Sequence, residues 1–182
     1  MRPFLVILAL ATMAAPAVAA GQDPLVSVRN TGSGTYQVSA QFSVAAPPAV
    51  ARAVLTDYAG IPRFLPDVRR SRVVERGEGR ALVEQEAVSK FMFFSRRIHL
   101  LLDVEEGADV IRFRDQSGLS FTRYEGSWTI SPEGQGVELV YELTAAPSFD
   151  VPLFVIRKVL GADAREMTQH MRAEMMARAA AR

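Results

Sequence analysis

The sequence predicts an α+β domain in which an antiparallel sheet packs against one long C-terminal helix. Between residues 71 and 143, segments of alternating apolar and polar residues are separated by glycine-rich turns such as Gly77-Glu78-Gly79. Strands joined by such short turns are typical of a meandering antiparallel sheet. After Pro147 the apolar residues recur every three or four positions, which is the period of an amphipathic helix. That helix is about 28 residues long, or roughly 40 Å, so it lies along a large part of the sheet.

The first twenty residues are predicted to be a signal peptide and not part of the fold. Arg2 is the only charged residue among them, and the apolar run that follows it is too short to span a bilayer. Ala17-Val18-Ala19 then has the small-residue pattern of a cleavage site. We expect a leader over residues 1–20, cleaved after Ala19 or Ala20, and an exported domain over residues 21–182, periplasmic or secreted. An uncleaved N-terminal anchor is the alternative.

The composition restricts the partners of the domain. There are 21 basic residues, of which Arg2 lies in the leader, against 20 acidic ones. The domain therefore lacks the basic excess that nucleic-acid binding usually needs, and we expect no nucleic-acid partner and no stable protein partner. The chain has no cysteine, so the fold is stabilised by its core and not by disulfides, although the predicted compartment permits them.

The N-terminal part of the domain is predicted to form a hairpin and two short helices. Residues 26–30 and 36–44 alternate in polarity on either side of a Gly-Ser-Gly turn. Pro47-Pro48 ends the second strand and begins a helix over residues 49–58. Proline is tolerated there because an N–H in the first turn of a helix has no partner within the helix. A second helical turn is expected over residues 63–66.

Further strands are predicted to follow. They run from Val73 to the turn at Gly77 and over residues 82–90, 94–104, 110–116, 120–130 and 137–143, with a last turn over residues 132–136. In the strand that contains Trp128, the polar residues Arg123, Glu125, Ser127 and Thr129 take the opposite parity. Burying those polar side chains would cost several kcal/mol, whereas each large apolar side chain gains about 1.5–3 kcal/mol on burial. Trp128 is therefore expected on the face that packs against the long helix.

The long C-terminal helix has one apolar stripe. Asp150 is its expected N-cap, with Pro152 just inside the first turn. The stripe consists of Ile156, Leu160, Ala164, Met167, Met171 and Met175. The charged residues are assigned to the other faces of the helix, namely Arg157, Lys158, Asp163, Arg165, Glu166, Arg172 and Glu174.

This order of elements, together with short motifs, resembles the helix-grip superfamily. The motifs are Val54-Leu55-Thr56-Asp57-Tyr58, Phe64-Leu65-Pro66, Tyr124-Glu125-Gly126-Ser127-Trp128, and the prolines Pro147 and Pro152 before the last helix. The superfamily includes pollen-allergen-like proteins, START lipid-transfer domains and polyketide cyclases. The closer resemblance, over about residues 25–178, is to its polyketide cyclase/dehydrase and coenzyme Q-binding START-like branch. It implies a curved sheet wrapped around the long helix with a cavity between them, and it transfers no catalytic residue.

Metal and nucleophilic chemistry have little support in the sequence. With two histidines and no cysteine, a zinc site with three or four ligands is not expected, nor is any cofactor. His99 has the parity of the outer face of its strand, and His170 lies one position away from the methionine stripe. No G-x-S-x-G motif occurs, and neither histidine has a visible catalytic partner.

The predicted binding site is instead apolar. One helix cannot fill the whole concave face of such a sheet, so some apolar side chains are expected to line a pocket. The candidate ligand-binding residues are Phe64, Phe94, Phe113, Tyr124, Trp128, Tyr141, Met167 and Met171. Ordinary core packing is the alternative for each of them. Because Ile156, Val159 and Leu160 are branched and stiff, we expect the N-terminal half of the helix to be tight and the pocket to lie beside the methionines.

Three functions remain open from the sequence. The first is binding, with or without transfer, of a hydrophobic small molecule such as a lipid or isoprenoid quinone, which we favour because no catalytic constellation is visible. The second is a cyclase or dehydratase that uses the same cavity, with Tyr124, Tyr141, Arg96 and Glu86 as candidate groups. The third is a protein that masks an apolar segment of a partner.

A transient contact with a membrane surface is a separate hypothesis. Phe91-Met92-Phe93-Phe94 is followed by Arg96-Arg97, a pattern in which an apolar tip enters the lipid interface and the arginines meet phosphates. The alternative is ordinary core beside a solvated basic edge, which is common on neutral domains. We favour the alternative.

Overall fold

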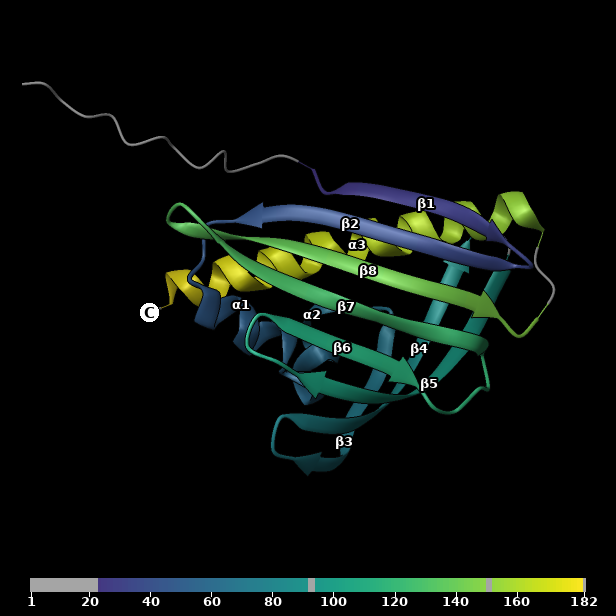
Figure 1. Ribbon diagram of the computed structural model, residues 1–182, viewed down its shortest axis with the longest axis horizontal. Helices are drawn as coiled ribbons and strands as arrows, with labels where there is room; N and C mark the ends of the chain where they lie inside the picture. The colour runs from purple at the N-terminus through teal and green to yellow at the C-terminus, as the bar shows by residue number, and fades with distance from the viewer. Residues whose placement is uncertain (1–22, 92–93, 150–151, 182) are drawn as a thin grey trace, which may run out of the picture.

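The computed structural model describes residues 23–91, 94–149 and 152–181 (Figure 1). The predicted leader and the expected helix cap Asp150 lie outside the described residues. Within them, one open antiparallel sheet of eight strands curves around a long helix, α3 (Leu153–Ala180). The predicted fold class, a curved sheet that grips a C-terminal helix, is confirmed.

The strands follow one another as a meander with a single jump. Their bounds are β1 (Leu25–Gly32), β2 (Thr35–Val44), β3 (Val68–Gly77), β4 (Arg80–Phe91), β5 (Phe94–Glu106), β6 (Val110–Asp115), β7 (Phe121–Glu133) and β8 (Gly136–Pro147). Across the sheet the order is β1-β2-β8-β7-β6-β5-β4-β3. The N-terminal hairpin β1–β2 therefore joins the meander β3–β8 at the β2–β8 pair, and β1 and β3 form the two edges.

Two short helices fill the connection between β2 and β3. They are α1 (Pro48–Leu55) and α2 (Ile61–Phe64), with the 3₁₀ turn η1 (Tyr58–Gly60) between them. As the sequence predicts, a proline stands at the start of α1, where its missing N–H is not needed. Both helices pack against α3, and Figure 1 shows them next to its C-terminal part.

Side chains of one parity in each strand form the core. In β2 the inward residues Val38, Ala40 and Phe42 are at most 5% exposed, and Phe42 pairs across to Leu139 in β8. Trp128 is also buried, so it lies on the concave face as its parity predicts. The residues of the other parity face solvent on the convex side, which is why the polar and apolar residues alternate.

Several boundaries differ from the prediction; α1, for example, ends at Leu55 and not at residue 58. β7 continues through Pro132, which pairs with Val137, because the two residues Gly134-Gln135 suffice for the turn. β3 begins at Val68, several residues before the expected Val73. Pro152 is the N-cap of α3 and not a residue of its first turn.

Candidate functional site

A row of six aromatic side chains crosses the concave face of the sheet. Neighbouring ring centroids along it are between 4.7 and 6.4 Å apart, a separation at which aromatic pairs attract each other. In order, the row consists of Phe42, Trp128, Tyr141, Phe113, Tyr124 and Phe121. Four of the eight candidate binding residues are thus brought together. Phe42 and Phe121 were not among the candidates, although Phe42 lies in a clean alternating strand.

Gly126 makes the middle of this row continuous. It lies between Tyr124 and Trp128 on the inward parity of β7 and pairs with Phe113 of β6. A Cβ atom here would be 2.7 Å from Cζ of Phe113 and would collide with the carbonyl oxygen of Glu142. The absence of a side chain therefore lets the Phe113 ring lie over the strand, where it stacks on Tyr141 at an interplanar angle of 14°.

Asp163 faces the sheet from α3, which the sequence analysis did not anticipate. Its Oδ2 accepts a hydrogen bond of 2.8 Å from the Ser89 hydroxyl of β4. We had assigned Asp163 to the solvent faces with the other charged residues, and this assignment is wrong. The signal was present, because Asp163 follows Leu160 by three positions and precedes Met167 by four, which places all three on one face of a helix.

The ionisable groups in this region have strongly perturbed pKa values. Burial raises the pKa of Asp163 to about 6 against the opposing effect of the Ser89 hydrogen bond, and Asp67 and Glu166 raise it further. Burial also raises the pKa of Tyr124, and raises that of Tyr141 well above its ordinary value. Both phenols therefore stay protonated, and the Asp163 carboxyl titrates close to neutral pH.

Several inward-facing residues at this end keep part of their surface accessible. Phe113 and Tyr124 of the aromatic row are only half-buried, as are Ser89, Asp163 and Met167. They belong together, because Phe113 contacts Tyr124, Ser89 bonds to Asp163, and Met167 follows Asp163 by one helical turn. The interior around Asp163 and Met167, in the middle of α3, is therefore not fully closed by side-chain packing, although Ile156 and Leu160 nearer the N-terminus are buried. We call these five residues the open end.

The C-terminal half of α3 is also packed tightly, whereas we expected the pocket to lie beside its methionines. Met175 and Thr168 are fully buried and Met171 is 4% exposed. Phe64 of α2 is also buried at this end, and the Arg178 guanidinium lies 5.8 Å from the centroid of its ring. Helices α1 and α2 occupy the space that we had assigned to a pocket. The candidates Phe64 and Met171 therefore belong to this closed end of the core.

A group of charged residues fastens the closed end. Arg178 donates to Asp57 over 2.7 Å and to Glu174 over 2.6 Å, and Arg63 donates to the same Asp57 oxygen over 2.9 Å. Burial alone would raise the pKa of Asp57, but hydrogen bonding and the positive charge of Arg178 lower it below its ordinary value. The end of α3 is thereby attached to the segment between α1 and η1.

Of the remaining candidates, Arg96 pairs across the strands with Ser89 of the open end, and the others lie on the convex side or outside the described residues. The side chain of Phe94 lies outside the described residues, as do those of the tip over residues 91–94 that suggested membrane contact. Glu86 is exposed and pairs with His99 on the convex side of β4. Arg96 is exposed as well, with its guanidinium 3.6 Å from the centroid of the Phe149 ring.

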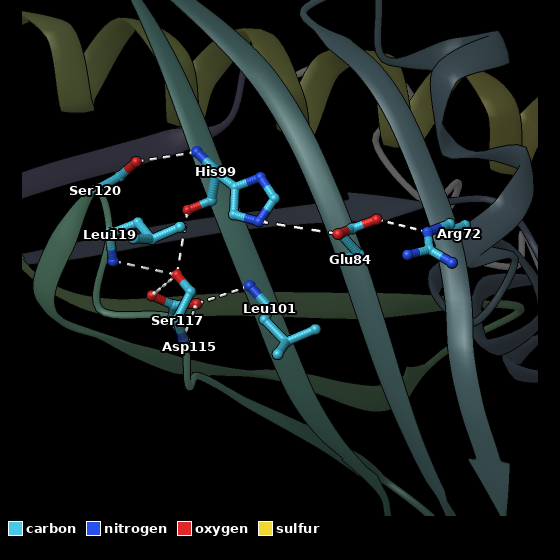
Figure 2. Close-up of polar contacts among 8 residues, drawn as sticks. All are labelled: Arg72, Glu84, His99, Leu101, Asp115, Ser117, Leu119 and Ser120. Atoms are coloured by element: carbon cyan, nitrogen blue, oxygen red, sulfur yellow. Dashed lines mark hydrogen bonds and ion pairs between the residues drawn. The ribbon is translucent and has the colours of Figure 1, made fainter.

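Serine, histidine and acidic residues do approach each other on the outer side of the sheet, but their geometry is not that of a catalytic triad. Figure 2 shows that the Ser120 hydroxyl accepts a hydrogen bond from the backbone N–H of His99, not from its ring. The imidazole points instead toward Glu84, at 4.0 Å, and Glu84 is bound by Arg72 over 2.5 Å.

Asp115 has a structural role beside these residues. Its carboxylate accepts hydrogen bonds from the backbone N–H groups of Leu101, Ser117 and Gly118 and from the Ser117 hydroxyl. It holds the turn after β6 against β5, at the point where their strand pairing ends.

Two hollows of about 370 and 490 Å³ lie on the convex face of the sheet. Their walls include Glu142 and Thr144 in the first, and Arg80, Asp103 and Arg114 in the second. Both follow the curvature of the strands on the side away from α3, and charged or polar residues predominate in their walls, with Phe113 added in the second. They are therefore different from the apolar site predicted between sheet and helix.

Among the helices of the described residues, none is both long and apolar enough to cross a membrane.

A curved sheet that grips a long helix, with an inward aromatic row, defines a protein of the START-like, helix-grip class. Residues 44–172 match the model of the family described as polyketide cyclase/dehydrase and lipid transport. The chain belongs to this family. No curated protein matches the sequence.

Solved structures agree on the fold. TTHA0849 from Thermus thermophilus superposes with a TM-score of 0.68 at 25% identity, over 78% of this chain and 98% of that one. The Zhui aromatase/cyclase from Streptomyces sp. R1128 superposes with a TM-score of 0.66 at 16% identity, over 80% of this chain and 94% of that one. A STAR-related lipid transfer protein from Xanthomonas axonopodis superposes with a TM-score of 0.62 at 16% identity, over 82% of this chain and 98% of that one. The same fold therefore serves a named enzyme and a named lipid transfer protein, so it does not by itself decide between them.

Proposed function

We propose that this protein binds a hydrophobic small molecule, such as a lipid or an isoprenoid quinone, between the sheet and the middle of α3. The observation that supports this most directly is the open end. Aromatic and methionine side chains that face the interior, Phe113, Tyr124 and Met167, keep accessible surface there. Incompletely covered apolar surface inside a domain is what an apolar ligand fills.

A second candidate is a cyclase or dehydratase that acts on such a ligand. It is favoured by one observation, the presence of protonated phenols and a near-neutral carboxyl in the same interior, on Tyr124, Tyr141 and Asp163. A group whose pKa lies near the working pH can serve as a general acid or base. Of the four groups that the sequence offered for this role, only the two tyrosines lie in the interior.

Extraction of the purified protein tests the binding function. We expect native mass spectrometry of the protein, and organic extraction of it, to recover a bound apolar molecule. A variant that fills the open end, Met167→Trp, should lose this molecule. Met176→Trp is the matched control, because Met176 stands on the same helix but is 43% exposed. Equal recovery from both variants would argue against the open end as the binding place.

Turnover distinguishes the second candidate from the first. The extracted molecule is added back to ligand-free protein and the mixture is followed by mass spectrometry. Binding alone returns the molecule unchanged, whereas a dehydratase reduces its mass by one water. If a cyclase yields a product of the same mass as the substrate, a change in chromatographic retention detects it.

We also propose that the domain is exported after removal of residues 1–20. The A-x-A pattern at Ala17-Val18-Ala19 supports this. N-terminal sequencing of the protein recovered from its native cell should begin at Ala20 or Gly21. An intact Met1 on the folded protein would contradict the proposal.

A further inference from the structure

The open end combines apolar walls with a small polar group that the proposed function leaves unexplained. Asp163 reaches into it from α3 and Tyr124 from β7, while the rest of its lining includes Phe113 and Met167. A carboxyl group on the sheet-facing side of a helix is costly unless it has a partner. The Ser89 hydroxyl supplies one hydrogen bond to it, the only one that it receives from the described residues.

Tyr124 offers a complementary donor. Its ring contacts Phe113 and Phe121 in the aromatic row, and a phenol hydroxyl can donate one hydrogen bond. A ligand group that both accepts from Tyr124 and donates to Asp163 would satisfy the two residues together, and a hydroxyl group has both capacities.

The charged groups that act on Asp163 and Tyr124 are acidic, whereas Arg96, the cross-strand partner of Ser89, has its guanidinium over the Phe149 ring. The ionisable groups that act on Asp163 are Asp67, from the segment before β3, and Glu166, one turn along α3. Those that act on Tyr124 are Asp163 itself and Asp115. No arginine or lysine is among the groups that shift the described side chains Asp163, Tyr124 and Tyr141. An anionic ligand head placed beside Asp163 would thus meet a negative charge in an apolar surrounding.

We infer that the ligand of this site is an apolar molecule that ends in an uncharged hydroxyl group, as in a long-chain or isoprenoid alcohol or a quinol, and that Asp163 excludes carboxylate-ended chains such as fatty acids. The inference rests on the proposed function and adds to it a ligand class and the residue that selects this class. Asp163 accepts from the ligand hydroxyl, Tyr124 donates to it, and the hydrocarbon lies along the aromatic row.

A pair of ligands of equal chain length tests this inference. Trp128 is the single tryptophan of the chain and contacts Tyr141 in the aromatic row, so its fluorescence reports on occupancy. Purified, ligand-free protein is titrated with 1-decanol and with sodium decanoate at about pH 7.5, and calorimetry gives the Kd independently. We expect decanol to bind at least about tenfold more tightly, the factor that corresponds to about 1.4 kcal/mol.

Variants assign the selection to Asp163. Asp163→Asn keeps the shape and removes the charge, and we expect it to bring the two Kd values within about threefold of each other, mainly through tighter decanoate binding. Glu105→Gln removes one charge from the convex face, where Glu105 is 57% exposed, and should leave the ratio unchanged. Tyr124→Phe should weaken decanol binding about two- to tenfold, because it removes one hydrogen bond.

The outcomes separate the two proposals. Equal affinity of the native protein for decanol and decanoate, or a ratio that is the same in Asp163→Asn, overturns the hydroxyl selection and leaves apolar binding intact. Absence of any Trp128 response and of any heat with both ligands overturns the proposed function and the selection with it. If Asp163→Asn fails to fold by circular dichroism, the native ratio and the Tyr124→Phe result decide.

Discussion

The two halves of α3 meet the rest of the molecule in different ways. The C-terminal half packs on α1 and α2, buries Met175 completely, and is fastened through Arg178 to Asp57. Nearer the N-terminus Ile156 and Leu160 are buried against the sheet, but Asp163 and Met167 in the middle of the helix are only half-buried. One helix thus combines an end that is fully packed with a segment that is left partly accessible. Regions that bind or open are in general those with the least complete packing.

The largest expected effect comes from truncating methionines at the two ends. Met175→Ala should lower the free energy of unfolding by about 2–5 kcal/mol, because it creates a cavity in a filled core. Met167→Ala should cost less than about 1 kcal/mol, since solvent already reaches that side chain. Urea unfolding followed by circular dichroism measures both. Similar losses of stability in the two variants would mean that Met167 and Met175 are packed equally tightly.

A smaller effect is expected in the sheet below the open end. Gly126→Ala introduces a Cβ against the Phe113 ring and the Glu142 carbonyl, and should cost about 1–3 kcal/mol, the usual range for overpacking. Gly77→Ala is the matched control, because a Cβ there meets nothing within 4 Å. We expect the control to be neutral within about 0.5 kcal/mol. A Gly126→Ala protein as stable as the control would show that the aromatic row is not packed over this glycine.

The titration of Asp163 should make the stability of the open end depend on pH. Burial raises its pKa to about 6 in the folded state, above the value of an unfolded chain. As the pH rises from about 4 through 6, the unfolded state loses its proton first, so this group makes the folded state progressively less stable. The groups that face or flank it, Ser89, Asp67 and Glu166, set the size of the effect.

Asp163→Asn removes this dependence. Relative to the native protein, we expect it to be equal in stability near pH 4 and about 1–2 kcal/mol more stable above pH 7, given about 1.4 kcal/mol for each unit of pKa. Thermal or urea unfolding across this range measures the difference. A constant difference at all pH values would show that Asp163 keeps an ordinary pKa.

The smallest effect concerns the ion pairs of the closed end. Arg178→Gln should cost about 0.5–1 kcal/mol, because the pair with Asp57 is partly exposed and screened by solvent. The lowered pKa of Asp57 has the opposite consequence to that of Asp163, since its contribution to stability is present at neutral pH and is lost as the pH falls through the folded pKa. Hydrogen exchange of the last turns of α3 is the most local measurement. If the protection of these amides from exchange is unchanged in Arg178→Gln, the Arg178–Asp57 pair does not stabilise the closed end.

Sequence patterns located most of the aromatic site because strand parity is a local property. Trp128 and Tyr141 lie on alternating strands whose other parity is polar, so their inward direction follows from a period of two. Asp163 was misassigned by residue type, although its helical spacing from Leu160 was correct for the buried stripe. A charged residue on an apolar stripe is the kind of local conflict that often marks a functional site.

By itself, the sequence determined the order of the elements, their approximate bounds and the inward parity of each strand. These follow from backbone periodicity and from turn and helix-start residues, which act over a few positions. Only the tertiary structure decided that the methionine end of α3 is closed. That outcome depends on how far the curved sheet stands from the helix and on where α1 and α2 fill the gap, and residues distant in sequence set both. Ile156 and Leu160 are buried as their stiffness suggested, but the flexibility of Met171 and Met175 carried no information about the size of the space that they enter.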